Sequence, residues 1–179
     1  CTDCRRLWSD FRGGRIDATE IEAVNARLAP TPGTCMVMGT ASTMACIVET
    51  MGLALPTAAS IPATHADRLR SAEASGRVAV ALAQRGAPAP SELMTRAAFR
   101  NALVVLQAIG GSTNALIHLT AAAGRRGIRI DLDEVDALGR EVPVLVDLKP
   151  SGQHYMEHFH WAGGVPRLLH ELRDRLDLD

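Results

Sequence analysis

A cysteine in a glycine-bounded loop is the residue of this chain best suited to chemistry. Cys35 stands in the segment 33–45, GTCMVMGTASTMA, where the loop is expected to run straight into a long apolar helix. The first amides of a helix are unpaired and carry the positive end of its dipole, so they favour a thiolate. A thiolate attacks electrophiles or binds iron. The alternative is a structural role, because unpaired cysteines are often buried as small hydrophobic residues.

A second candidate is a pair of glycines followed by hydroxyl and amide side chains. Gly110 and Gly111 precede Ser112, Thr113 and Asn114, which are expected to open a helix. Such a helix start binds carboxylate or phosphate groups through backbone N–H groups, and hydroxyl side chains assist. The same residues also suit an ordinary helix C-cap followed by an ordinary N-cap. Both interpretations are open from these residues alone.

Histidines near the end of the chain match a zinc pattern. His154, Glu157 and His158 have the spacing of the H-x-x-E-H motif of inverzincin metalloproteases, and His160 is nearby. One helix would place His154 and His158 on the same face, as zinc requires. However, a third ligand must come from a downstream acidic residue, and only a short stretch of chain follows. Residues 150–152, PSG, also favour a turn at His154 rather than a helix interior.

The other cysteines indicate no structural metal site. Cys1 and Cys4 form a C-x-x-C pair, but no strand precedes it and no second pair follows at zinc-finger spacing. Cys35 and Cys46 are separated by ten residues across the expected helix start, which is a poor match to structural zinc sites. We expect all of these cysteines to be free or metal-bound rather than disulfide-paired.

Composition narrows the class of protein. The 179 residues suit one domain or a large piece of one, and 47% are apolar while only 3% are aromatic, which favours closely packed helices. The formal net charge of −1, without a basic patch, argues against a nucleic-acid partner. The chain shows no membrane span and no signal peptide, so we expect a cytoplasmic protein. It starts with cysteine rather than methionine, which suggests a fragment.

Caps, breakers and periodicity predict a mainly helical chain. Asp17 and Glu20 form a capping box, and Thr95 caps a helix that is apolar almost all round and should be central. Helices are predicted over 5–11, 17–28, 40–52, 64–85, 95–109, 112–126, 133–138, 155–160 and 166–176, with an extended piece at 128–132 and a strand at 143–148. The buried face of the helix over 64–85 is expected to contain Ala72, Val78, Ala79 and Leu82.

Four blocks of sequence, in this order and at this spacing, resemble the dihydroxy-acid dehydratase and phosphogluconate dehydratase family. They are 33–44, GTCMVMGTASTM, with 49–56, ETMGLALP; 60–63, SIPA; 110–115, GGSTNA, with His118 and Leu119; and 143–166, which contains PVL, KPSG, ME and AGGVP. The opening residues Thr2-Asp3, Leu7-Trp8 and 12–16, RGGRI, are similar to the sugar-acid branch, the arabinonate and xylonate dehydratases. The resemblance runs essentially end to end and covers about a third of a full-length member.

This resemblance implies a defined chemistry. Family members convert a 2,3-dihydroxy carboxylate, such as a sugar acid or a branched-chain dihydroxy acid, to a 2-keto acid by loss of water. They use an iron–sulfur cluster, 2Fe–2S or 4Fe–4S by branch, with Mg²⁺ beside it. Three cysteines hold the cluster, and Cys35 matches the last of them. Ser112, Thr113 and Asn114 are expected near the substrate as supporting groups, without a catalytic role.

Part of the family's site has no match in this chain. The first two cluster cysteines, the C-D-K block that supplies metal ligands and the C-terminal serine base are all missing from the sequence. His158 stands where family members commonly have an acidic residue. Because the family retains this block without the histidines, the resemblance removes the zinc interpretation. We therefore predict that this chain alone is inactive and holds no stable cluster. The alternative is a non-catalytic helical interaction domain that has kept family sequence.

The resemblance also implies the fold and the partners. The expected class is α/β, and this chain would be a helix-dominated portion of the N-terminal α/β domain, with few strands. Residues 1–148 would be part of that domain, and residues 149–179 its end, leading towards a C-terminal β-domain. The expected partners are a small polyhydroxy carboxylate and further copies of the full-length protein, because family members usually form dimers or tetramers.

Overall fold

The computed structural model describes residues 2–29, 31–86 and 88–178. Cys1, and with it the C-x-x-C pair that it forms with Cys4, lies outside the described residues. The helices are α1 (Thr2–Arg12), α2 (Ala18–Asn25), α3 (Thr40–Thr50), α4 (Ala66–Arg85), α5 (Pro90–Leu93), α6 (Arg96–Ala108), α7 (Asn114–Arg125), α8 (Leu132–Glu141), α9 (Met156–Trp161) and α10 (Gly164–Leu172), followed by the 3-10 helix η1 (Arg173–Arg175).

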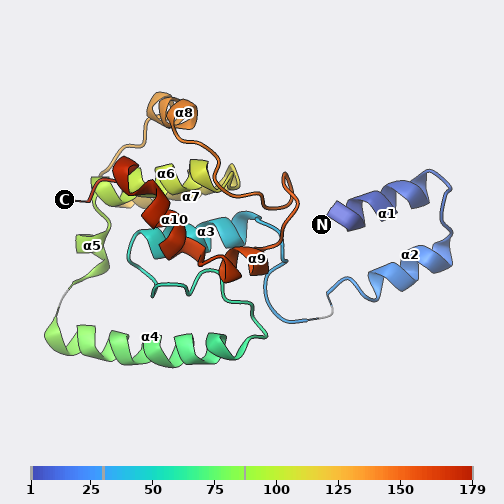
Figure 1. Cartoon of the computed structure of the whole chain (residues 1–179), viewed down its shortest axis with the longest axis horizontal. Helices are drawn as coiled ribbons and strands as arrows, with labels where there is room; N and C mark the ends of the chain where they lie inside the picture. Colours follow the sequence, from blue (N-terminus) through green and yellow to red (C-terminus); the bar gives the residue numbers. More distant parts are fainter. Residues whose placement is uncertain (1, 30, 87, 179) are drawn as a thin grey trace.

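Helices α3 and α6 pack against each other at the centre of the fold (Figure 1). Helices α7 and α10 contact α3, while α7 and α8 contact α6. Helices α1 and α2 contact each other and lie to one side of this body (Figure 1). The loop that carries Cys35 joins this pair to α3, so it runs between the outlying helices and the core.

The core is built around α6, as its apolar character predicts. The buried residues of this helix are Phe99, Ala102, Leu103, Val104, Val105, Leu106 and Ala108. Helix α3 adds Cys46 and Ile47, and α7 adds Ala115 and Leu119. The same core includes Phe159, Val165, Leu168 and Leu172 from the C-terminal helices. Residues near the end of the chain therefore pack in one cluster with the central helices.

Capping residues correctly predict where two of the helices begin. The Asp17 carboxylate accepts a hydrogen bond from the N–H of Glu20 at 2.8 Å, and the Glu20 carboxylate accepts one from the N–H of Asp17 at 3.3 Å. Thr95 Oγ1 accepts from the N–H of Ala98 at 3.1 Å, at the start of α6. These bonds satisfy amides that a helix leaves unpaired, so each boundary is set by neighbours in sequence.

The predicted strand at 143–148 is wrong. The described residues form no β-strand, and their one β-type contact is an isolated parallel bridge between Leu148 and His154. The N–H of Leu145 donates instead to the carbonyl of Ala108, at the end of α6, at 2.8 Å. A β-branched run becomes a strand only beside another strand, and the described segments supply none. The helix-dominated character is confirmed, whereas the α/β class stays a prediction.

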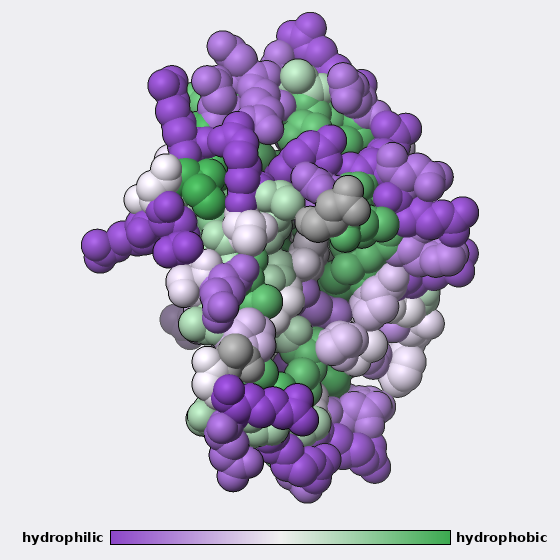
Figure 2. All heavy atoms as spheres, turned by 90° about the vertical axis from the view of Figure 1, so that its left-hand side faces the viewer, coloured by the Kyte–Doolittle hydropathy of each residue, from purple (hydrophilic) through white to green (hydrophobic). Residues whose placement is uncertain are grey.

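The expected burial of α4 is also wrong. None of its residues is buried; Ala72, Val78 and Ala79 are exposed and Leu82 is half-buried. Helix α4 lies along the edge of the molecule (Figure 1). The face on the left of that view also shows hydrophobic residues at the surface, between hydrophilic ones (Figure 2). Periodicity predicts an apolar face, but burial requires a neighbouring element. A helix with the long apolar run needed to cross a membrane is not found in the described segments.

The core position of α7 leads to a stability prediction. Leu119 is 1% exposed, whereas Ile117 on the same helix is 69% exposed. We expect Leu119→Ala to lower the free energy of unfolding by about 2–5 kcal/mol, because the substitution removes buried methyl groups and leaves a cavity. The matched variant Ile117→Ala should change it by less than about 0.5 kcal/mol. Urea denaturation followed by circular dichroism measures both values, and equal losses would contradict the described core.

Candidate functional site

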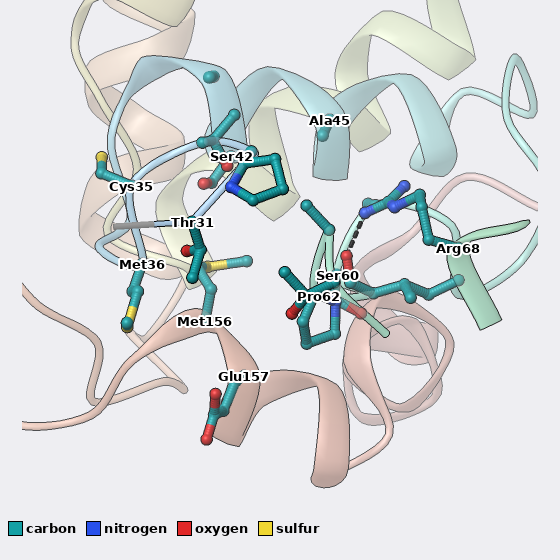
Figure 3. Close-up of a pocket in the computed structure, with 18 of the residues that line it drawn as sticks. Thr31, Cys35, Met36, Ser42, Ala45, Ser60, Pro62, Arg68, Met156 and Glu157 are labelled. Carbon is teal, nitrogen blue, oxygen red and sulfur yellow. Dashed lines mark hydrogen bonds between the residues drawn. The ribbon is translucent and has the colours of Figure 1, made fainter. Parts of the chain in front are cut away.

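A pocket of about 400 Å³ lies between the loop before α3, the loop before α4 and the start of α9 (Figure 3). Cys35 and Met36 lie on one side of it, and Ser60, Pro62 and Arg68 lie on the other (Figure 3). The complete lining consists of residues 31–36, Ala41, Ser42, Ala45, residues 58–64, Arg68, Met156 and Glu157. The pocket therefore brings Cys35 together with side-chain hydroxyls, one guanidinium group and one carboxylate.

The structure exposes Cys35 and places it at the edge of this pocket (Figure 3). Helix α3 begins at Thr40 with Gly39 as its N-cap, as predicted, so Cys35 precedes the first residue of the helix by five positions. The field of a helix terminus falls off within the first turn, so it is exposure that makes Cys35 available to a ligand. The alternative of a buried, structural cysteine is wrong for Cys35.

That alternative describes Cys46 instead. Cys46 has no exposed surface and belongs to the core cluster. Burial, reinforced by the nearby charge of Glu49, raises the pKa of its thiol from 9.0 to about 12. Cys46 therefore stays protonated at neutral pH and is unsuited to bind iron, since the thiolate is the metal ligand. The structure separates two cysteines that look alike in the sequence.

The loop that carries Cys35 is anchored to the C-terminal segment. The N–H of Met38 donates to the carbonyl of Lys149 at 2.7 Å, and the N–H of Met156 donates to the carbonyl of Met36 at 2.8 Å. Lys149 Nζ donates to the hydroxyl of Tyr155 at 2.8 Å, and this bond is the main reason that the pKa of Lys149 is raised. Residues after 143 thus hold the backbone on one side of Cys35.

The opposite wall of the pocket depends on Glu49, a residue that the sequence interpretation missed. Glu49 is 7% exposed, and its carboxylate accepts hydrogen bonds from the N–H groups of Thr57 at 2.6 Å and Ala59 at 2.8 Å. Burial raises the pKa of Glu49, while these two bonds act in the opposite direction. An acidic residue within the apolar run 40–52 is the signal that identifies it, because buried charges require partners.

Arg68 and His160 also hold this wall of the pocket in place. Arg68 Nη1 donates to the carbonyl of Ala58 at 2.9 Å, and its Nη2 donates to the carbonyl of Ile61. Ser60 Oγ lies 3.1 Å from His160 Nδ1. The wall is therefore tied to α3, α4 and α9 by polar groups of three different helices.

Ser112, Thr113 and Asn114 do not line the pocket with Cys35. Ser112 Oγ and Asn114 Nδ2 each lie 3.0 Å from Thr40 Oγ1, and the N–H of Ser112 donates to Thr43 Oγ1 at 3.0 Å. Three amide or hydroxyl groups of this turn are thus already bonded to the first turn of α3. Thr113 and Asn114 are exposed, and Ser112 is half-buried. Their predicted role beside the substrate stays a prediction.

The histidine motif does not form a metal site. His154 precedes α9 rather than lying in it, as the turn signal predicts. Its ring lies 5.4 Å from that of His158, whose Nδ1 accepts from the N–H of Tyr155 at 3.1 Å. Across residues 2–29, 31–86 and 88–178 no group of three His, Cys, Asp or Glu side chains is placed to hold an ion. The zinc interpretation gains no support.

Comparisons with known proteins agree on one family. The family described as "Dihydroxy-acid/6-phosphogluconate dehydratase N-terminal" matches residues 1–179. A dihydroxy-acid dehydratase of Aeropyrum pernix is 42% identical over 162 residues, which are 90% of this chain and 29% of the relative. Relatives of the same name from Rippkaea orientalis (40% over 159 residues; 89% and 28%) and Thermodesulfovibrio yellowstonii (39% over 166 residues; 93% and 30%) are similar. The chain thus spans less than a third of the length of these relatives.

The contrast between the two cysteines can be tested by alkylation. At pH 8 we expect iodoacetamide to modify Cys35 and to leave Cys46 unmodified, because a pKa of about 12 keeps the Cys46 thiol protonated and its side chain is buried. Mass spectrometry of the digested chain identifies the modified residues, and in urea both should react. Rapid modification of Cys46 in the folded chain would contradict the structure.

The raised pKa of Cys46 in the folded chain also predicts a loss of stability at alkaline pH. The unfolded chain releases the Cys46 proton near pH 9.0 and the folded chain only near pH 12, so the folded chain binds more protons between these values. The contribution of Cys46 is complete below pH 9 and declines as the pH rises towards 12. Urea denaturation at pH 8 and pH 10 measures the decline, which should be smaller in Cys46→Ala.

Proposed function

Because the chain belongs to the dihydroxy-acid/6-phosphogluconate dehydratase family, we propose that it is part of an iron–sulfur hydro-lyase that dehydrates a 2,3-dihydroxy carboxylate to a 2-keto acid. The observation that carries the proposal is the exposed Cys35 at the edge of the pocket. Cys35 is a ligand of the cluster in this proposal. The names of the relatives support the reaction, since each is a dihydroxy-acid dehydratase.

The described residues fit one ligand position of a cluster. Iron–sulfur clusters are held by several cysteine thiolates, and Cys35 is an exposed thiol that forms no disulfide within the described part of the chain. Cys46 is excluded by its burial and raised pKa. The remaining ligands would come from segments beyond this chain. When bound, the cluster would supply an iron with an open coordination position, a Lewis acid for the departing hydroxyl.

Mg²⁺ needs ligands beyond this chain in the same way. The ion takes oxygen ligands in near-octahedral geometry, and carboxylates are its usual protein contacts. Glu157 is the one carboxylate that lines the pocket, and the described residues contain no cluster of three acidic or histidine side chains around it. We therefore assign no magnesium ligand to this chain.

The residues of this chain would bind and orient the substrate. Hydroxyl groups of Thr31, Thr34 and Thr64 line the pocket and suit the hydroxyls of a polyhydroxy carboxylate. Arg68 adds a positive charge at the same wall, which favours an anionic ligand. Ser112, Thr113 and Asn114 are proposed as supporting groups at the first turn of α3.

The substrate of the complete protein is either a sugar acid or a branched-chain dihydroxy acid. The opening motifs of the sequence support the sugar-acid branch, whereas the three relatives are named for dihydroxy acids. Turnover assays with both substrate classes distinguish the two. The family resemblance also supports a homo-oligomeric protein of the cytoplasm, as part of the same proposal.

Cluster binding tests the assignment of Cys35. In the chain extended by its flanking segments, we expect anaerobic reconstitution with iron and sulfide to give a cluster absorbance and dehydratase turnover. Cys35→Ser should lose both, because the protein loses one of its thiolate ligands, whereas Cys4→Ser should keep both. The isolated chain should show neither, since one thiolate does not hold a stable cluster.

Two outcomes would argue against the proposal. A stable cluster on the isolated chain would show that the other ligands lie within it. An extended protein that folds but neither binds iron nor turns over either substrate class would favour the alternative, a non-catalytic helical interaction domain.

A further inference from the structure

We infer that Glu49 is a positioning residue for Cys35: its buried carboxylate fixes the loop 57–63, and this loop in turn supports the backbone that carries the thiol. The functional meaning of this inference rests on the proposed role of Cys35 as a cluster ligand. The physical link itself runs through contacts that the structure describes between α3, the pocket wall and the loop before α3.

The first contact is the clamp at the start of the wall. Both carboxylate oxygens of Glu49 are used, one by the N–H of Thr57 and one by the N–H of Ala59. Thr57 has φ of 71°, and it is the one non-glycine residue with positive φ in the described ranges. A β-branched residue rarely adopts this conformation, so the surrounding bonds must hold it there. The Glu49 carboxylate supplies the shortest of these bonds, and the carbonyl of Thr57 accepts a second one from the N–H of Ser60 at 3.3 Å.

The second contact holds the other edge of the same loop. Arg68 donates to the carbonyls of Ala58 and Ile61, so the N–H groups of the loop face an anion and its carbonyls face a cation. Ser60 is 4% exposed and contacts His160 from α9. Both charged groups are required for one loop conformation, because each satisfies backbone groups that the loop leaves unpaired.

The third contact joins this loop to the loop of Cys35. A Cβ placed on Gly33 would lie 2.4 Å from Cβ of Ala63, so the Ala63 methyl group packs against residue 33 only because that residue is glycine. Gly33 also has φ of 109°, which favours glycine. Cys35 therefore lies between a wall contact at Gly33 and the hydrogen bond from Met156 to Met36. Release of the wall would free one of these two supports.

Amide hydrogen exchange of the folded chain tests the link directly. The N–H of Met156, bonded to Met36, reports on the Cys35 loop, and the N–H of Val104 in α6 reports on global unfolding. We expect Glu49→Gln to speed exchange at Met156 at least about tenfold and to leave Val104 within about twofold. The amide that replaces the carboxylate presents an N–H₂ group to one of the two loop N–H donors.

Matched variants separate positioning from ordinary destabilisation. Glu73→Gln on the exposed face of α4, where Glu73 pairs with Arg77, should change neither rate. Thr57→Gly added to Glu49→Gln should restore slow exchange at Met156, because glycine adopts the positive φ without the clamp. If Glu49→Gln does not fold, Arg68→Gln removes the cation that binds the carbonyls of the same loop and should give the same pattern. The control is Arg70→Gln, because Arg70 is exposed.

The inference is overturned if Met156 exchange stays unchanged, or if Met156 and Val104 accelerate by the same factor. Neither result depends on iron, so this experiment tests the structural role of Glu49 even if the proposed function is wrong. In the extended protein, the iron content per chain should fall in Glu49→Gln and be retained in Glu73→Gln. Equal iron content in both variants would also count against a positioning role.

Discussion

Helix α3 packs against α6 in the centre of the core, and each part of the candidate site is attached to α3 at a different point along its length. Its first turn binds the Ser112 turn, its middle is buried with Cys46 and Ile47, and its last turn carries Glu49 to the pocket wall. The loop of Cys35 enters the fold at the N-terminal end of this helix. Its burial therefore fixes the frame in which these loops meet.

The polar residues of α3 explain why the site has one defined arrangement. Thr43 and Glu49 are buried in a largely apolar interior, where an unpaired donor or acceptor costs about 1–3 kcal/mol. Among the described residues no buried side-chain nitrogen or oxygen lacks a partner. Each of these groups reaches its partner in a loop from elsewhere in the chain. Because these buried polar atoms must be paired, the packing of α3 also fixes the positions of the loops that it contacts.

Sequence reasoning succeeds where the determinants are local. The capping box of Asp17 and Glu20 and the cap at Thr95 are completed by neighbours within three residues. Helix α6 is apolar on nearly every side, so its central position can be predicted without knowing which elements pack against it. Two predictions fail for the opposite reason. The strand at 143–148 and the buried face of α4 both require a neighbouring element that the described residues do not provide.

The sequence by itself determined where α2 and α6 begin, the central position of α6, the family resemblance and the choice of Cys35 as the residue best suited to chemistry. The tertiary structure decided that Cys35 is exposed while Cys46 is buried, and that Ser112 and Asn114 bond to α3 rather than line the pocket. It also identified Glu49 as the support of the pocket wall. Exposure, pKa and long-range hydrogen bonds depend on groups far apart in the chain, and only packing brings those groups together.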